Sequence, residues 1–148
     1  NFGGVLNIDG IPVGKQLKKF SFADQITSHA DGSCMVVVAT DAPLDHRNLM
    51  RLAKRAFLGI GLTGGIASNG SGDYIIAFST APQLRSPYSG KQKTIKEDIL
   101  LNEETSPLFL SAIEATAEAI WNSLIAAETM TGLKGRTVEA LPIEKLKL

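Results

Sequence analysis

The chain has 148 residues, of which 44% are hydrophobic, and this size and composition predict a single globular domain and exclude a disordered chain. Fifteen basic residues balance fifteen acidic ones, so the net charge favours neither a nucleic-acid ligand nor an anionic membrane surface. A single cysteine excludes an internal disulfide, and no apolar run approaches the ~20 residues of a membrane-spanning helix.

The N-terminal part of the chain predicts a hairpin and then a linker. Residues 1–14 alternate apolar and polar side chains around Asp9–Gly10, which is a typical turn dipeptide. Residues 15–32 are polar and mixed, so we expect an exposed linker there. Such a linker would present the Gly32–Ser33 peptide bond, and a glycine before the serine permits the strained backbone angles that favour an N-to-O acyl shift.

The next region predicts a strand, a helix and a second strand. Residues 36–38 are three consecutive valines, which favour a strand covered on both faces. Asp45 is a plausible N-cap for a helix that we expect to end at Gly59. Its apolar residues recur at helical spacing: Leu49, Leu52, Ala53, Ala56 and Phe57. A glycine-rich stretch, 59–73, then leads to a second buried strand at 74–78.

The C-terminal half predicts a long excursion, a helix and a short tail. Residues 81–104 are polar and contain prolines, with a short strand expected near 99–101. A helix from about 107 to about 127 is capped by Ser106 and has this apolar stripe: Phe109, Ile113, Ala117, Ile120, Trp121, Leu124 and Ile125. A short strand at 138–141 and a helix start at Pro142 follow. Alternating strands and helices predict α/β layering.

Ser33 is the first candidate for chemistry. If the peptide bond before it is cut, Ser33 gains an α-amine, whose reference pKa of ~7.7 to 8.0 suits a general base near neutral pH. One residue would then supply both nucleophile and base. The alternative is an ordinary loop serine that opens a strand, and the residue pattern alone favours that alternative.

Three further residues have two interpretations each. Ser71 and Asp73 occupy alternate positions, so in an extended segment their side chains share a face and can orient a nucleophile and its amine. Turn formation is the alternative for both. Cys34 is a better intrinsic nucleophile than serine, but strand alternation directs it away from Ser33, and we expect it in the core.

Other catalytic classes find weaker support. His29 and His46 with Asp41 could form a Ser-His-Asp triad, but their spacing is generic and a solvated His46 is the simpler interpretation. Two histidines among scattered carboxylates have no metal-site signature. The glycine-rich stretch lacks the Gly-Lys-Ser/Thr ending of a phosphate-binding loop. We therefore expect neither a metal nor another cofactor.

Three separated motifs occur in an order that resembles a known family. They are Asp31–Leu44 (DGSCMVVVATDAPL), Asn69–Asp73 (NGSGD) followed by Ala77–Thr80 (AFST), and Glu128–Gly132 (ETMTG). Together they resemble the β-aminopeptidase family, which also contains the L-aminopeptidase/D-amino-acid esterase-amidases. The resemblance covers almost the whole chain as the C-terminal part of a longer precursor. It implies a four-layer αββα sandwich, of which this chain supplies only the C-terminal portion.

The resemblance also implies roles for individual residues. Ser33 aligns with the nucleophile, which self-cleavage between Gly32 and Ser33 releases. Ser71 and Asp73 align with the catalytic serine and acidic residue, although many members carry glutamate in place of Asp73. Asn1 aligns with the asparagine whose amide stabilises the oxyanion, a contribution of typically ~3 kcal/mol; a turn asparagine is the alternative. The family's catalytic tyrosine would lie in the N-terminal part of the precursor.

The domain organisation follows from the same resemblance. Residues 1–32 would end the N-terminal segment with its linker, and residues 33–148 would form the C-terminal segment, both within one domain. The expected partners are the N-terminal segment of the same precursor and further copies, which form a homo-oligomer of processed heterodimers. No nucleic acid or membrane is expected as a partner. We expect a soluble protein, and its compartment, cytoplasm or periplasm, stays open.

The implied activity is that of a self-processing serine aminopeptidase or amidase. It would release N-terminal amino acids, including β- or D-residues, from small peptides, amides or esters through an acyl-enzyme on Ser33. One alternative is an acyltransferase of the ornithine acetyltransferase type, but that family uses threonine as nucleophile, so Ser33 argues against it. The other alternative is a non-catalytic fragment.

Overall fold

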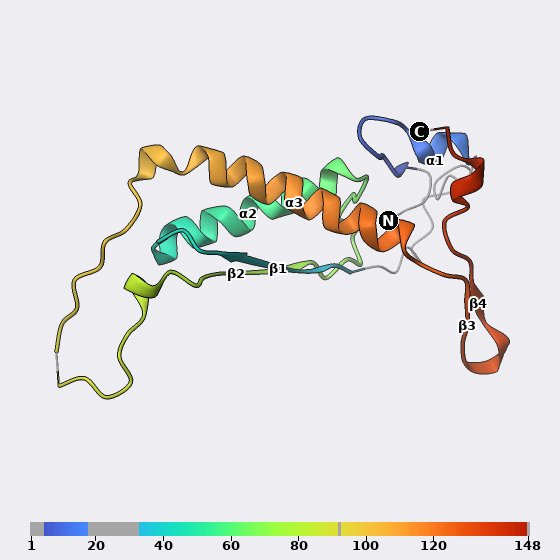
Figure 1. Ribbon diagram of the computed structural model, residues 1–148. Helices are drawn as coiled ribbons and strands as arrows, with labels where there is room; N and C mark the ends of the chain where they lie inside the picture. Colours follow the sequence, from blue (N-terminus) through green and yellow to red (C-terminus); the bar gives the residue numbers. More distant parts are fainter. Residues whose placement is uncertain (1–4, 18–32, 92, 148) are drawn as a thin grey trace.

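The computed structural model describes residues 5–17, 33–91 and 93–147 (Figure 1). Its centre is a pair of strands, β1 (Met35–Thr40) and β2 (Tyr74–Ser79), with two long helices on one face. These helices are α2 (His46–Leu62) and α3 (Ser106–Ile125), which pack against each other. The expected α/β layering is therefore present, as one helical layer on one sheet.

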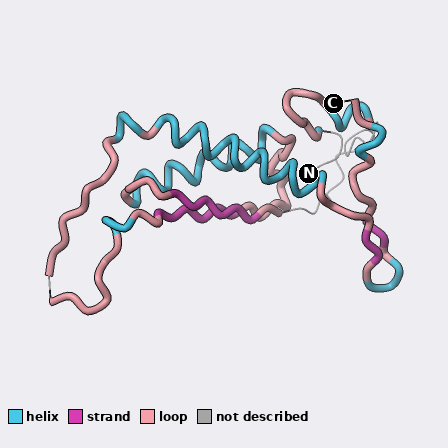
Figure 2. The backbone as a smooth tube through the Cα atoms, viewed as in Figure 1, coloured by secondary structure: helices cyan, strands magenta, loops and turns pink. Residues whose placement is uncertain are grey.

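The two strands are parallel, and α2 is the crossover between them. The register runs from Met35 opposite Tyr74 to Thr40 opposite Ser79. A parallel pair needs such a crossover because the chain must return from the end of the first strand to the end of the sheet at which both strands start. The segments before β1 and before β2 therefore lie side by side, although 39 residues separate them in sequence (Figure 2).

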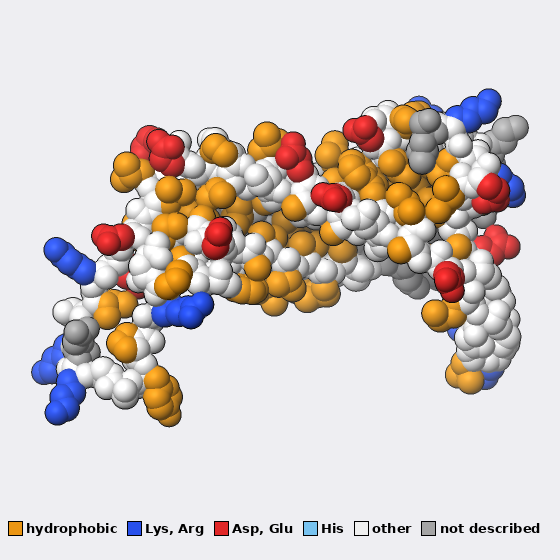
Figure 3. All heavy atoms as spheres, in the orientation of Figure 1, with side chains coloured by type: hydrophobic (Ala, Val, Ile, Leu, Met, Phe, Trp, Pro, Cys, Tyr) orange, Lys and Arg blue, Asp and Glu red, His pale blue; other side chains and the backbone are white. Residues whose placement is uncertain are grey.

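The expectation that both strands are covered on both faces is wrong for the described residues. Burial alternates along β1 and β2, and the side chains that face the helices are half-buried. Apolar side chains on the opposite face are exposed: Met35, Val37, Tyr74, Ile76 and Phe78. Figure 3 shows hydrophobic side chains gathered along the lower edge of the molecule. The valine run could not reveal this, because a strand's own sequence does not say which elements lie over it.

Helix α2 begins as predicted and continues beyond its predicted end. The side chain of Asp45 accepts a hydrogen bond from the backbone N–H of Asn48 at 2.8 Å, which confirms the N-cap. Gly59 does not end the helix, which continues to Leu62. A Cβ on Gly59 would lie 2.6 Å from the carbonyl oxygen of Ile113, so this glycine lets α2 and α3 approach closely.

Helix α3 closely matches the predicted range, but its predicted cap is wrong. Ser106 is the first helical residue, and Thr105 before it makes no side-chain cap to the helix. The hydroxyl of Thr105 instead donates to the carbonyl of Asn102 at 2.7 Å. The core between the helices and the sheet is formed by Leu44, Leu52, Phe109 and Ala112.

The two ends of the chain share a second core at the end of α3. The predicted turn at Asp9–Gly10 is present, with an antiparallel bridge between Ile8 and Ile11. Helix α1 (Val13–Gln16) follows, so the predicted linker does not begin at residue 15. Trp121 packs on this core and donates its indole N–H to the carbonyl of Asn7 at 2.8 Å.

The remaining segments are short and exposed. The excursion contains the 3-10 turns η2 (Pro82–Leu84) and η3 (Asn102–Glu104), and its described part has no strand at 99–101. The tail forms a small antiparallel pair, β3 (Met130–Thr131) and β4 (Thr137–Val138), around the 3-10 turn η4 (Leu133–Gly135). The predicted strand at 138–141 is thus shorter and earlier, and the helix expected at Pro142 is the 3-10 turn η5 (Ile143–Lys145).

Candidate active site

Ser33 lies immediately before β1, beside the segment that leads into β2. The register of the strands, continued backwards by two residues, places Ser33 opposite Gly72. The backbone N–H of Gly72 donates a hydrogen bond of 2.9 Å to Oγ of Ser33. Among the described residues Ser33 is exposed, so nothing in this part of the chain covers it. The Gly72 contact nevertheless fixes the position of its hydroxyl.

Asp73 links both strand starts to Ser71. Its Oδ1 accepts the backbone N–H of Cys34 at 2.8 Å. Its Oδ2 accepts the hydroxyl of Ser71 at 2.8 Å. One carboxylate therefore fixes the residue that follows Ser33 and the orientation of the Ser71 hydroxyl.

The structure forms a turn in the first half of this segment. The turn lies at Asn69–Gly70, and the backbone N–H of Ser71 donates to the carbonyl of Ser68 at 2.8 Å to close it. Ser71 and Asp73 come after the turn, where their side chains face each other. Ser71 and Asp73 therefore lie outside the turn itself, and their side chains bond to each other and to the backbone of Cys34.

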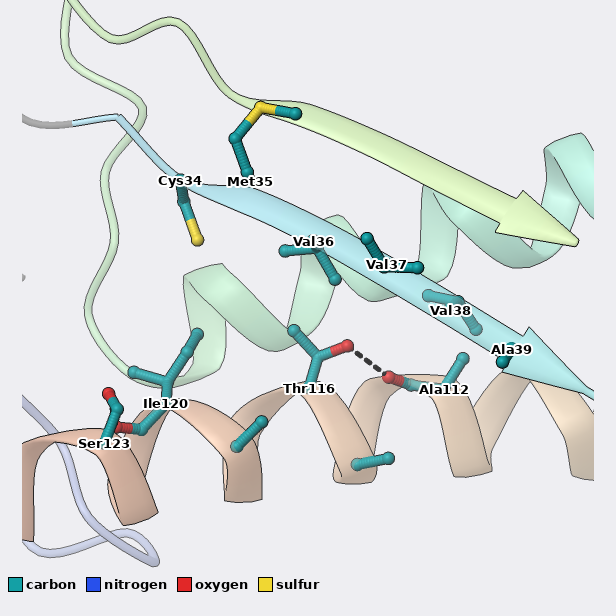
Figure 4. A pocket seen from close by; sticks show the side chains of 12 residues that line it. Cys34, Met35, Val36, Val37, Val38, Ala39, Ala112, Thr116, Ile120 and Ser123 are labelled. Atoms are coloured by element: carbon teal, nitrogen blue, oxygen red, sulfur yellow. Dashed lines mark hydrogen bonds between the residues drawn. The ribbon is translucent and has the colours of Figure 1, made fainter. Parts of the chain in front are cut away.

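Cys34 points away from this cluster, as strand alternation predicts. Its side chain is directed toward α3 (Figure 4). The residue is half-buried and lines an open groove beside β1. The expectation of a closed core position is therefore only partly correct.

The remaining candidates either lie outside the described residues or lie far from Ser33. Asn1, Gly32 and His29 lie outside the described residues. Asp41 and His46 follow β1, so the length of the strand separates them from Ser33. This placement excludes His46 and Asp41 as triad partners of Ser33. Across the described residues, no three His, Cys, Asp or Glu side chains converge as a metal site would need.

The contact from Gly72 was not anticipated from the sequence. A backbone amide carries no residue-type signal, and the Ser-Gly-Asp spacing indicated only the two side chains on either side of it. The missing information was the parallel register, which alone brings Gly72 opposite Ser33.

Comparison with known proteins assigns the chain to a family. Residues 1–138 match the family model described as peptidase family S58. The chain belongs to peptidase family S58. The matched region of this S58 chain includes Ser33, Ser71 and Asp73.

Relatives of known name or structure agree with this family. The curated β-peptidyl aminopeptidase BapA of Sphingosinicella microcystinivorans is 39% identical over 96% of this chain. The crystal structure of the PH0078 protein from Pyrococcus horikoshii OT3 is similar with 43% identity and a TM-score of 0.80 over 96% of this chain and 37% of that one. An L-aminopeptidase D-Ala-esterase/amidase from Ochrobactrum anthropi, described as a variant of the Ntn hydrolase fold, is similar with 36% identity and a TM-score of 0.79 over 97% of this chain and 38% of that one.

The S58 chain spans only part of these proteins. It covers 38% of the length of the curated BapA relative. Within the described residues, no helix has the length and hydrophobicity to cross a membrane.

Proposed function

We propose that the full-length protein is a self-processing serine aminopeptidase or amidase with Ser33 as its nucleophile. The observation that carries the proposal is the hydroxyl of Ser33 at the start of β1, beside the hydrogen-bonded pair Ser71 and Asp73. A hydroxyl nucleophile with a carboxylate and a second hydroxyl on the neighbouring strand segment is an arrangement suited to acyl transfer. Membership of peptidase family S58 agrees with this chemistry.

The first chemical step is maturation between Gly32 and Ser33. Oγ of Ser33 attacks the carbonyl carbon of Gly32, the C–N bond breaks, and the released α-amine of Ser33 takes up the proton from the hydroxyl. Water then hydrolyses the resulting ester. Residues 1–32 become the end of one chain, and residues 33–148 become the start of another within the same domain.

The catalytic cycle then uses the two groups on Ser33. Its α-amine accepts the hydroxyl proton as Oγ attacks the substrate carbonyl, and the resulting ammonium donates that proton to the leaving amine. Water, activated by the same amine, attacks the acyl-enzyme and releases the amino acid with regeneration of Oγ–H. Asp73 carries the negative charge that favours the ammonium form, and it holds Ser71 toward the reacting groups.

The oxyanion needs hydrogen-bond donors, and these can act without carrying a charge. The side-chain amide of Asn1 has this property, and we assign it this role on the strength of the family resemblance. A tyrosine from the N-terminal part of the precursor would complete the site.

The exposed apolar face of the sheet supports the four-layer sandwich. Five large apolar side chains on one face of β1 and β2 are between 43% and 64% exposed. A face of this kind is normally covered. In the proposed enzyme a second sheet and its helices, built largely from precursor residues outside this chain, pack on it, and the processed heterodimers assemble into a homo-oligomer.

The substrate class follows from the relatives. One solved relative is described as a D-Ala-esterase/amidase and another, from Burkholderia sp., as a β-aminopeptidase. We therefore propose small peptides, amides or esters with an N-terminal β- or D-amino acid as substrates. Acyl transfer to an amine, as in the ornithine acetyltransferase family, is the second candidate. That family uses threonine as its nucleophile, so Ser33 argues against it.

The test uses the full-length protein purified from an expressing host. Wild type should release p-nitroaniline from β-alanyl-p-nitroanilide or D-alanyl-p-nitroanilide in water without an added amine, while Ser33→Ala should not. Ser106→Ala, at an exposed serine at the start of α3, is the matched control and should retain activity. Product release that requires an added amine acceptor would favour the acyltransferase, and activity in Ser33→Ala would exclude Ser33 as nucleophile.

A further inference from the structure

Gly72 leaves a space beside the nucleophile. A Cβ on Gly72 would lie 3.5 Å from Oγ of Ser33 and 3.5 Å from Cε2 of Tyr74, and both are ordinary van der Waals contacts. Apart from the neighbours of Gly72 in sequence, no other described residue comes within 4 Å of that point. A carbon atom of a bound molecule can therefore occupy this place and touch the nucleophilic oxygen and an aromatic ring together.

Tyr74 borders this space, and Met35 lies opposite Tyr74 in the parallel register. Because side chains alternate along a strand, Ser33 points to the same face of the sheet as Met35. Figure 4 shows Met35 on the other side of β1 from Cys34. Met35 is 63% exposed and Tyr74 is 64% exposed, so the described chain leaves both side chains open on the face that carries the nucleophile.

The other apolar side chains of this face lie further from the nucleophile. Val37, Ile76 and Phe78 follow along the strands, away from the strand starts at which Ser33 lies. In the proposed sandwich a second sheet can bury these three side chains fully. Complete burial of Met35 and Tyr74 would also close the space beside Ser33, so these two are placed to contact a substrate.

The chemistry of this space indicates which group fits there. Its described borders are the aromatic ring of Tyr74 and the bare Cα of Gly72, with the thioether of Met35 across the register. The Asp73 carboxylate is occupied, because its two oxygens accept from Cys34 and Ser71. Aromatic rings and thioethers favour apolar contacts, whereas a charged group would lose hydration without a partner among these side chains.

We propose that Gly72 and Tyr74 form the pocket for the acyl part of the substrate and select N-terminal residues with an apolar side chain. This inference rests on the proposed function, with Ser33 as the nucleophile. The side chain of the residue to be released lies in the space at Gly72, against the ring of Tyr74, while its carbonyl carbon faces Oγ of Ser33. Met35 borders the pocket on the side of β1.

The test compares two substrates that differ only in this side chain. They are β-alanyl-p-nitroanilide, which has none, and β-homoleucyl-p-nitroanilide, which carries an isobutyl group. The measured quantity is the ratio of the kcat/KM of the β-homoleucyl substrate to that of the β-alanyl substrate, because this ratio does not depend on the fraction of full-length protein that has matured. Wild type should prefer the β-homoleucyl substrate. Gly72→Ala fills the space and Tyr74→Ala removes the ring, so each should lower the ratio by about tenfold or more.

Matched control variants separate the pocket from other roles. Gly72 lies outside the positive-φ region, so its backbone accepts alanine. Gly70→Ala adds a Cβ that meets nothing within 4 Å, and Tyr88→Ala removes an exposed tyrosine of the excursion, so both should keep the wild-type ratio. Tyr74→Phe keeps the ring and should keep the ratio as well. A structural role alone for Gly72 or Tyr74 would lower both kcat/KM values together and leave their ratio unchanged.

The outcomes separate this inference from the proposed function. A wild-type preference for the β-alanyl substrate, or an unchanged ratio in Gly72→Ala and Tyr74→Ala, overturns the pocket even in an active enzyme. A changed ratio in Tyr74→Phe assigns the effect to the phenolic hydroxyl and also overturns it. If Gly72→Ala does not fold, the two variants of Tyr74 decide.

A wild type that hydrolyses neither substrate refutes the enzymatic proposal, and the pocket is then decided by binding. Calorimetry measures the affinity of the full-length protein for free β-homoleucine and free β-alanine. Tighter binding of β-homoleucine that is lost in Tyr74→Ala supports the pocket. Equal affinity for the two amino acids overturns it.

Discussion

Asp73 binds the backbone of Cys34: its Oδ1 accepts the N–H of Cys34 at 2.8 Å across the start of the parallel pair. The same carboxylate accepts the hydroxyl of Ser71 through its other oxygen, also at 2.8 Å. The residue directly after Ser33 is thus positioned by a side chain 39 residues further along the chain. The hydrogen bond from Cys34 needs only an acceptor oxygen at position 73, whereas the proposed catalytic role needs the negative charge. A substitution can therefore separate the two roles.

We expect Asp73→Asn to fold and mature but to hydrolyse small amides slowly. The amide oxygen can still accept from Cys34, whereas the negative charge that the proposed mechanism uses is lost, so kcat should fall by ~10² or more. The measurement is kcat on a small amide substrate with processed, full-length protein. Asp41→Asn, at an exposed aspartate beyond the other end of β1, is the control and should behave as wild type. Wild-type turnover in Asp73→Asn would leave Asp73 with a turn-forming role alone.

Self-cleavage should depend on the hydroxyl of Ser33. Intact mass and N-terminal sequencing of the full-length protein should reveal a C-terminal fragment that begins Ser-Cys-Met-Val. Ser33→Ala should remain uncleaved, because no hydroxyl is present to attack the Gly32 carbonyl, whereas Ser33→Thr keeps a hydroxyl and should restore cleavage. Appearance of the same fragment from Ser33→Ala without added protease would contradict the mechanism.

Cys34 should be dispensable for the chemistry. Its side chain points toward α3 and away from Ser33, so Cys34→Ala should retain turnover within about tenfold, with ~1 kcal/mol lost from packing. The checks are kcat and the burst of acyl-enzyme on a small amide or ester. If acylation disappears while maturation proceeds, the nucleophile is the thiol.

Two glycines of α2 should respond oppositely to the same substitution. A Cβ on Gly59 would lie 2.6 Å from the carbonyl oxygen of Ile113 and 2.7 Å from Cβ of Thr116, so Gly59→Ala forces α2 and α3 apart. We expect it to lower the free energy of unfolding by about 1–3 kcal/mol.

Gly61 is the matched control for this prediction. A Cβ on Gly61 has no neighbour within 4 Å, and the residue is exposed in the same helix. Gly61→Ala should therefore raise the free energy of unfolding by roughly 0.5–1 kcal/mol, through the better helix propensity of alanine. Denaturant unfolding of the full-length protein measures both variants, and equal effects would mean that the close approach at Gly59 does not determine stability.

Local sequence signals were sufficient where a residue acts on its immediate neighbours. The Asp45 cap, the turn at Asp9–Gly10 and the position of α3 each depend on side chains within a few residues. The predicted end of α2 at Gly59 failed for the opposite reason. A glycine ends a helix or lets two helices touch according to what lies beside it, and here α3 lies beside it.

The sequence by itself determined the order of strand, helix, strand and helix, and it singled out Ser33, Ser71 and Asp73. Hydrophobic periodicity gives the order of elements because it is a local property of the chain, whereas the three residues stand out through the motifs that resemble the family, since the residue pattern alone favours a loop serine and turn formation. Only the tertiary structure decided that β1 and β2 are parallel with Met35 opposite Tyr74. That register places the Gly72 amide on Ser33 and the Asp73 carboxylate on Cys34, since hydrogen bonds between segments 39 residues apart exist only after the crossover helix has brought the strands together.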